Sequence, residues 1–326
     1  MSGSTQNDCA FLFLTEACNL SCKHCYVSAH PSKGGEMPAS IIRRAFEVCA
    51  QLGIKHLRLT GGEPTIHREF DSILAEATSR GFKVGLVTNG LRFLRMAGVE
   101  LLLKQLSRCW VSAYGPTAAI HSHIGGELAP SFSEVLSRVG EWTQGGHAIG
   151  VSVLLKPGSA MESAGLLERA LATGVRRLRF IPMQPDGRGV RYFAGDWSEW
   201  PEELAQLFQR LRNTSLCEEF QEITLNDPFD LAARFPDKMD SCFLRRRRMW
   251  SVVPTGDVYP CCFAAYETKR KLGNIMEDDI IRRLQGKLPL AERVPPCRAF
   301  SRSFWPGIPG KLVSCPVSHI ALRARG

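Results

Sequence analysis

Short apolar runs alternate with amphipathic stretches between Cys9 and Met183. The runs have the length expected of strands, whereas the stretches between them repeat apolar residues every three or four positions, as helices do. The pattern predicts strands over residues 11–15, 56–60, 83–88, 109–114, 148–155 and 175–183. It predicts helices over residues 38–52, 69–80, 91–106, 131–144 and 162–173.

This alternation of strands and helices predicts an α/β fold. Strands joined by helices form parallel βαβ units, which wind into a barrel or an open sheet. In both arrangements ligands bind at the carboxyl ends of the strands. The residues that directly follow each predicted strand are therefore the first candidates for a functional site.

The pattern changes after Met183. Residues 183–197 contain Gly and Pro in an irregular run and predict a connection, and residues 200–213 predict a further helix. Beyond that helix the periodicity fades and cysteines become frequent. We therefore expect a disordered N-terminus over 1–8, a core domain over 9–197, a connecting helix and linker over 198–235, and a small cysteine-rich module over 236–326.

Composition narrows the class of protein. The chain has 326 residues, of which 44% are hydrophobic and 22% charged, as expected of a globular protein. It contains no apolar run long enough to span a membrane. The segment from Met1 to Asp8 is polar and lacks the features of a signal peptide. We therefore expect a cytoplasmic protein that does not bind a membrane.

The net charge of +9 is compatible with an acidic or phosphorylated substrate, with nucleic acid, or with a solubilising surface alone. The basic run Arg245 to Arg248 lies among the later cysteines. A solvated turn, or charge compensation for an anionic cluster, explains this run more simply than substrate binding does. A nucleic-acid partner is disfavoured, because aromatic residues that would stack on bases do not interleave with the basic ones.

Cysteine is the residue type that points to chemistry. Twelve cysteines in a chain without a secretory signal favour metal ligation or catalysis over disulfides. Cys18, Cys22 and Cys25 lie in one loop directly after the first predicted strand. A four-iron cluster held by three cysteines leaves one iron open to a substrate or cosubstrate. The spacing alone leaves open a zinc site with His24 as the fourth ligand.

Further motifs follow the next strands at the same edge. Thr60-Gly61-Gly62-Glu63-Pro64 follows the second strand, TNG (88–90) the third, and VSAYG (111–115) ends the fourth. Together with the C-x3-C-x2-C loop, this series resembles the radical S-adenosylmethionine (radical SAM) superfamily over roughly residues 10–183. The resemblance implies a partial (β/α)6 TIM-like barrel with a small cysteine-rich C-terminal module.

The resemblance also implies the cofactors. Cys18, Cys22 and Cys25 would hold a [4Fe-4S] cluster whose fourth iron is chelated by the amine and carboxylate of S-adenosylmethionine. Reductive cleavage of S-adenosylmethionine would give a 5′-deoxyadenosyl radical that abstracts a hydrogen atom from the substrate. The electron would come from a low-potential donor such as flavodoxin or ferredoxin.

Six other residues are expected to bind S-adenosylmethionine by the same resemblance. Glu63 would accept hydrogen bonds from its amino group, and His24 would lie against its adenine. Gly61 and Gly62 would allow a close approach of the backbone. Asn89 and Ser112 would contact the ribose or the carboxylate.

The C-terminal segment SVVPTGDVYPCC (251–262) resembles the SPASM and Twitch modules, which bind auxiliary iron–sulfur clusters. A full SPASM module has more cysteines than the five found after residue 240. We therefore expect one auxiliary [4Fe-4S] cluster, with the ligands Cys242, Cys261, Cys297 and Cys315. Cys262 would be left over, as an alternative ligand to Cys261, as a hydrogen-atom donor to a substrate radical, or as a structural neighbour.

Residues 111–139 are similar to the same region of SPASM peptide maturases. This likeness implies modification of a ribosomal peptide by a crosslink, an epimerisation or an oxidation. The alternative is the oxidation, epimerisation or cyclisation of a small molecule, such as an antibiotic sugar, an aminocyclitol or a nucleotide-linked substrate. A non-catalytic zinc-binding module is a more remote alternative, because it leaves the Gly61-Gly62-Glu63 motif unexplained.

Overall fold

The computed structural model describes residues 9–183, 186–193, 198–226, 249–266, 270–285 and 319–324. The expected disordered segment, residues 1–8, lies outside the described residues. No helix in these described ranges is both long and apolar enough to cross a membrane.

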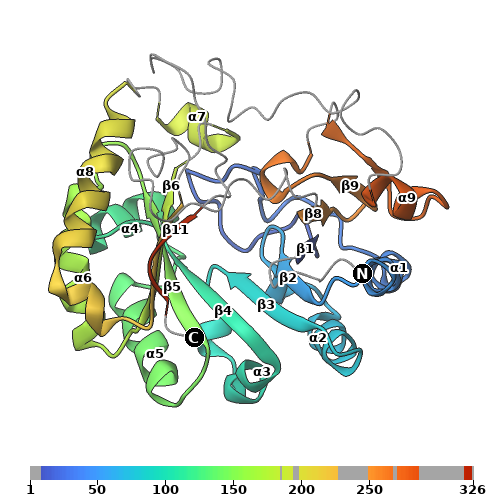
Figure 1. Ribbon diagram of the computed structural model, residues 1–326, viewed down its shortest axis with the longest axis horizontal. Helices are drawn as coiled ribbons and strands as arrows, with labels where there is room; N and C mark the ends of the chain where they lie inside the picture. The colour runs from blue at the N-terminus through green and yellow to red at the C-terminus, as the bar shows by residue number, and fades with distance from the viewer. Residues whose placement is uncertain are drawn as a thin grey trace.

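A parallel sheet forms the centre of the molecule (Figure 1). Six strands lie next to one another in chain order: β1 (Cys9–Phe13), β2 (His56–Thr60), β3 (Lys83–Thr88), β4 (Leu106–Ala113), β5 (Ile149–Leu155) and β6 (Arg177–Pro182). Each pairs in parallel with the next. The expected α/β fold with six parallel strands is confirmed.

Helices cover the outer face of the curved sheet (Figure 1). They are α1 (Ala39–Gln51), α2 (Phe70–Ser79), α3 (Val99–Gln105), α5 (Phe132–Gln144), α6 (Ala164–Ala172) and α8 (Trp200–Asn213). Each prediction of a long helix depended on one apolar stripe, and in α1 this stripe buries Ile42, Phe46 and Cys49. The predicted helix over 200–213 matches α8.

The helix predicted over 91–106 is wrong as one element. The chain forms a 3-10 turn over Phe93–Arg95 and then the separate helix α3. Gly98 lies between them with φ of +71°, a left-handed conformation that interrupts a helix and that glycine adopts at little cost. The short helices α4 (Ala118–Gly125), α7 (Arg188–Tyr192) and α9 (Ile280–Leu284) were not predicted, because they have too few turns for a clear period.

The sheet extends beyond the predicted strands at both edges. Strand β7 (Glu222–Asn226) pairs in parallel with β6, so residues 198–235 contain a strand of the main sheet besides the expected helix and linker. Strand β8 (Met249–Val252) pairs in parallel with β1. The strands β9 (Asp257–Tyr259), β10 (Gly273–Asn274) and β11 (His319–Ala324) add antiparallel pairs. The proposed domain boundaries stay a prediction.

The strands β8 and β9 form a hairpin that lies beside β1 (Figure 1). A small apolar cluster joins them to the sheet, in which Phe13 of β1 packs with Met249, Tyr259 and Cys261. The C-terminal cysteines at 261 and 262 are thereby brought next to the strand that precedes the N-terminal cysteine loop. This proximity follows from the pairing of β1 with β8.

Candidate active site

The three N-terminal cysteines lie in a loop that follows β1. Cys18 and Cys22 are buried, and Cys25 is half-buried. The backbone N–H of Leu20 donates to the Sγ of Cys18 at 3.4 Å, and the N–H of Ala29 donates to the Sγ of Cys25 at 3.3 Å. Donors directed at sulfur stabilise the thiolate form, which is the form that binds metal.

Burial keeps the thiols of Cys18 and Cys22 protonated when no cation is bound nearby. Burial raises the pKa of Cys18 to about 11 and that of Cys22 to about 12, and the neighbouring cysteines add to both shifts. An iron centre would supply the positive charge that stabilises the thiolates. The donor set of thiols and directed N–H groups therefore fits a cluster.

No three His, Cys, Asp or Glu side chains in the described ranges are placed to hold a single metal ion. The thiolates of a four-iron cluster bind different irons and therefore stand further apart than the ligands of one ion. No disulfide joins any two of the nine described cysteines.

The glycines of the TGGEP motif pack against the cysteine loop. A Cβ at Gly61 would lie 2.5 Å from the carbonyl oxygen of Thr15, and a Cβ at Gly62 would overlap that of Ala17. The N–H groups of Gly62 and Glu63 donate to these same two carbonyl oxygens, at 2.7 Å and 2.9 Å. Sequence reasoning missed this role, in which the glycines allow two segments of the chain's own backbone to meet. Their contact with S-adenosylmethionine stays a prediction.

Glu63 joins the ends of β2 and β3. Its carboxylate is buried and accepts hydrogen bonds from the N–H and Oγ1 of Thr65, from the Oγ1 of Thr88 and from the N–H of Asn89. Burial raises the pKa of Glu63, and these four donors oppose the shift. Among the described residues Oε2 accepts only the bond from Asn89, so this oxygen keeps capacity to accept from an ammonium group.

Asn89 holds the cysteine loop. Its Nδ2 donates to the Oδ1 of Asn19 at 2.7 Å and to the Sγ of Cys18 at 3.5 Å, and its Oδ1 accepts from the N–H of Leu91 at 2.9 Å. The side chain is buried and does not line the cavity described below. In this arrangement Asn89 positions Cys18, and its contact with the ribose or the carboxylate of S-adenosylmethionine stays a prediction.

The segment after β6 closes over the same loop. The side chain of Arg188 donates from Nε to the carbonyl oxygen of Cys22 at 2.9 Å and from Nη1 to that of Ala29 at 2.7 Å. Its backbone N–H donates to the carbonyl oxygen of Cys25 at 3.0 Å. Gly187 has φ of +55°, and a Cβ there would overlap the carbonyl oxygens of Cys25 and Tyr26. Gly187 and Arg188 thus clamp the cysteine loop.

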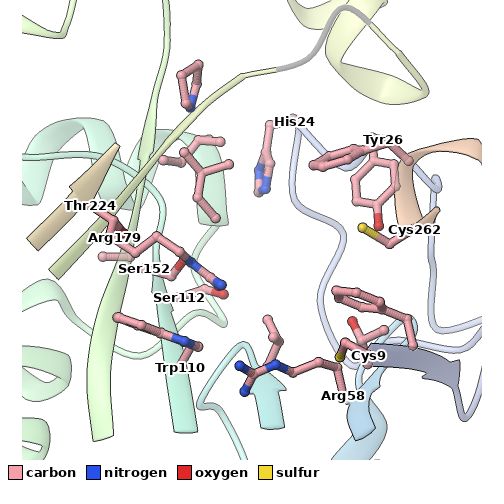
Figure 2. A pocket seen from close by; sticks show the side chains of 18 of the residues that line it. Cys9, His24, Tyr26, Arg58, Trp110, Ser112, Ser152, Arg179, Thr224 and Cys262 are labelled. Atoms are coloured by element: carbon pink, nitrogen blue, oxygen red, sulfur yellow. The ribbon is translucent and has the colours of Figure 1, made fainter. Parts of the chain in front are cut away.

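A cavity of about 530 Å³ lies inside the curve of the sheet, next to this loop. Residues from each of the eight strands β1 to β8 line it. The cavity brings together three of the predicted residues, His24, Ser112 and Cys262, from widely separated parts of the chain (Figure 2). The predicted residues Cys18, Cys22, Cys25 and Glu63 stand behind the cavity wall and do not line it.

His24 presents an unsatisfied nitrogen at this cavity. Its Nδ1 atom is buried and has no hydrogen-bond partner, and its ring lies 5.4 Å from that of Tyr114. Burial lowers the pKa of His24 to about 4, and nearby Arg188 adds to the shift, so the ring is neutral at neutral pH. Buried polar atoms normally have partners, and a ligand is the simplest partner for this one.

The adjacent cysteines at the end of the β8–β9 hairpin have different surroundings. Cys262 lines the cavity, with its sulfur close to the hydroxyl of Tyr26 in the view of Figure 2. Cys261 is buried in the apolar cluster with Phe13 and does not line the cavity. Burial raises the pKa of Cys262 to about 12, which keeps its thiol protonated.

The remaining proposed ligands of an auxiliary cluster, Cys242, Cys297 and Cys315, lie outside the described residues, as does the basic run 245–248. The assignment of Cys261 as a ligand therefore stays a prediction.

Comparison with known proteins decides the family. Residues 12–115 match the family described as the Radical SAM superfamily, and residues 242–292 match the SPASM family, described as an iron-sulfur cluster-binding domain. The chain belongs to the radical SAM superfamily. It is a radical SAM enzyme whose cofactors are a [4Fe-4S] cluster, S-adenosylmethionine and an auxiliary iron–sulfur cluster in the SPASM domain.

Relatives and solved structures agree with this assignment. The chain is 27% identical to mycofactocin maturase MftC of Mycobacterium ulcerans over 81% of its length and 70% of that protein. It is 26% identical to the PqqA peptide cyclase of Methylocella silvestris over 76% of its length and 66% of that protein. The fold is similar to that of Streptococcus suis SuiB bound to precursor peptide SuiA, with a TM-score of 0.69, 14% identity, and coverage of 85% of this chain and 64% of that one. The chain spans about two thirds of the length of the curated relatives it matches.

Proposed function

We propose that this radical SAM enzyme modifies a ribosomal peptide by a crosslink, an epimerisation or an oxidation. Two relatives that match most of the chain are named as a maturase and as a peptide cyclase, and SuiB, which has the same fold, was solved with a precursor peptide. The observation that carries the proposal is the cavity on which the cysteine loop and the β8–β9 hairpin converge. A substrate in this cavity lies between the elements proposed to hold the two clusters.

Cys18, Cys22 and Cys25 are proposed to hold the first [4Fe-4S] cluster. The N–H groups directed at Cys18 and Cys25, and the amide of Asn89 at Cys18, support this assignment. When bound, the cluster and S-adenosylmethionine supply a 5′-deoxyadenosyl radical that removes a hydrogen atom from the substrate. The protein's part is to orient these groups and to keep water away from them.

Three side chains are proposed to orient S-adenosylmethionine. The free acceptor capacity of Glu63 Oε2 suits its ammonium group. The unpartnered Nδ1 of His24 suits a donor on adenine, and the hydroxyl of Ser112 reaches the cavity from β4. Gly61 and Gly62 support this site through the packing of the cysteine loop.

Cys242, Cys261, Cys297 and Cys315 are proposed to hold the auxiliary [4Fe-4S] cluster. We further propose that a low-potential donor such as flavodoxin or ferredoxin supplies electrons and that the enzyme works in the cytoplasm, where cysteine thiols remain reduced.

Cys262 is proposed as a hydrogen-atom donor if the reaction is an epimerisation. Its S–H bond would break and a C–H bond would form at the substrate radical, leaving a thiyl radical. An electron from the low-potential donor and a proton from solvent would then restore the thiol. The position of Cys262 on the cavity and its protonated state support this role.

The proposal is tested with the anaerobically reconstituted enzyme, S-adenosylmethionine, a chemical reductant, and the short peptides encoded beside its gene. We expect 5′-deoxyadenosine to form together with a change in the mass or the stereochemistry of one peptide. A thermal-shift screen of nucleotide sugars is run in parallel. Stabilisation by a nucleotide sugar, with no change in any peptide, contradicts the peptide assignment and favours a small-molecule substrate.

A further inference from the structure

Two arginines face each other across the cavity. Arg58 extends from β2 and Arg179 from β6, and Figure 2 shows both guanidinium groups directed into the same space. Gly85 pairs with Arg58 in the neighbouring strand β3, where a Cβ would overlap the Nη1 atom of Arg58. The missing side chain at Gly85 therefore makes room for the guanidinium group inside the sheet.

Arg179 is held in one orientation. Its Nε and Nη2 donate to the Oγ of Ser152 at 3.1 Å and 3.0 Å, and its guanidinium group lies 4.7 Å from the ring centroid of Trp110. These contacts use one edge and one face of the group and leave Nη1 without a hydrogen bond to any described residue. A guanidinium oriented in this way is preorganised for an anion.

Neither arginine has an acidic partner among the described residues. Glu222 is the single carboxylate among the described residues that line the cavity, and it forms an ion pair with Arg108. Burial lowers the pKa of Arg179 to about 10, and the charge of Arg58 is the second cause. Arg179 is therefore cationic at neutral pH, and the charge of Arg58 disfavours its cation, an effect that the nearby carboxylate of Glu222 opposes. Charges in such surroundings are normally paired.

We propose that Arg58 and Arg179 bind a carboxylate of the peptide substrate, at a depth in the cavity below the loop that carries His24. This inference rests on the proposed peptide substrate and names its recognition element. Arg58 lies two residues before Thr60, the last residue of β2, so a group bound here lies deeper than the strand ends. A cavity of about 530 Å³ has room for the end of a peptide or a few side chains. The C-terminal carboxylate and an Asp or Glu side chain share this chemistry.

The test measures ligand binding by saturation-transfer NMR on the reconstituted enzyme, first without and then with saturating S-adenosylmethionine. The probes are N-acetyl-Ala-Ala-Ala as the free acid, the same peptide as its C-terminal amide, and N-acetyl-Ala-Asp-Ala amide. We expect the free acid to bind about tenfold or more tightly than the amide. Tighter binding of the Asp peptide than of the free acid would assign the site to a side-chain carboxylate.

Variants of the two arginines test whether the carboxylate probe binds to them. Arg58→Gln and Arg179→Gln should abolish the preference for the acid over the amide, and Arg179→Lys should retain part of it. Arg80→Gln is the matched control, since it removes a surface guanidinium that pairs with Glu76 on α2. Circular dichroism checks that each variant is folded.

Four results would overturn the inference. They are equal binding of acid and amide to the wild type, no binding of either carboxylate probe, loss of acid binding when S-adenosylmethionine is added, or displacement of the acid by a much lower concentration of inorganic phosphate. The third result would assign the arginines to the carboxylate of S-adenosylmethionine, and the fourth to a phosphorylated small molecule. Formation of 5′-deoxyadenosine by the wild type shows separately whether the radical chemistry itself is present.

Discussion

The cysteine loop after β1 and the β8–β9 hairpin approach the same cavity from paired strands, but they are held in different ways. Polar contacts hold the loop: the TGGEP backbone, Asn89 and Arg188 all bond to it. Apolar packing holds the hairpin, where Cys261 lies in a cluster with Phe13 and Met249. The carbonyl oxygen of Cys261 accepts hydrogen bonds from the Oγ of Ser251 at 3.0 Å and from the N–H of Ala264 at 3.2 Å, both in the same segment of the chain.

This difference suits different tasks. The loop must present three thiols in a fixed arrangement, and many directed hydrogen bonds restrain it without side-chain bulk. The hairpin places one cysteine toward the cavity and its neighbour away from it, which requires only that a short turn pack firmly against β1. We infer that contacts at the ends of the strands fix the geometry of the cysteine loop. The geometry of the hairpin site depends on its packing against β1, which is distant in the chain.

The largest effect is expected from removing the loop thiols. In the triple variant Cys18→Ala/Cys22→Ala/Cys25→Ala we expect iron to fall from about eight to about four atoms per chain, because one of two four-iron clusters is lost. Formation of 5′-deoxyadenosine should cease. Anaerobic iron and sulfide analysis with EPR measures both clusters. About four irons in the wild type and none in the variant would mean that the C-terminal cysteines hold no cluster.

The second largest effect is expected from the two hairpin cysteines, whose variants should differ in iron content. Cys261→Ala is expected to lose about four irons as a cluster ligand, whereas Cys262→Ala should keep the full content. Iron analysis on the two variants compares them directly. Loss of iron from Cys262→Ala would contradict the proposed role of Cys262 as a hydrogen donor. If only this variant lost iron, Cys262 would be the cluster ligand in place of Cys261.

Gly62→Ala is expected to destabilise the fold by about 1–3 kcal/mol, because the new Cβ overlaps the carbonyl oxygen of Ala17 and forces the loop away from β2. Urea denaturation of the reconstituted protein measures the loss. Gly34→Ala is the control, since no atom lies within 4 Å of a Cβ built there. Equal stability of the two variants would mean that the loop can shift without cost.

The smallest effect is expected from Arg188→Ala. The variant should fold normally but release iron from the loop cluster roughly tenfold faster in the presence of a chelator, because the side-chain bonds to the carbonyls of Cys22 and Ala29 are lost. Arg191→Ala, at an exposed position in α7, serves as the control. An unchanged rate of iron release would show that the hydrogen bonds of the TGGEP backbone hold the cysteine loop without the side chain of Arg188.

Much of the central architecture was predictable from local pattern. The period of apolar residues located β2, β3 and α8 at their observed bounds. Because parallel strands end at one edge, the motifs after β1, β2 and β3 could be expected to meet there. The glycine break at Gly98 and the short strand β7 were missed, since one residue or five provide too little periodicity to detect.

The cavity's arginines were also missed. In HLRLT and RLRFIP the charged residues alternate with apolar ones, as they do in any strand with one solvated face. An Arg on β2 opposite a Gly on β3 was the available signal, but reading it requires the register of the two strands. Alternation alone does not say which face of a strand lines a cavity.

The sequence by itself therefore determined the alternation of strands and helices, the family, and the loop that carries Cys18, Cys22 and Cys25, because each depends on residues close together in the chain. Only the tertiary structure decided that β8 pairs with β1, that Cys262 and not Cys261 lines the cavity, and that Arg58 and Arg179 are directed into the same cavity. These features depend on pairings between strands far apart in sequence, whose register no local pattern of residues specifies.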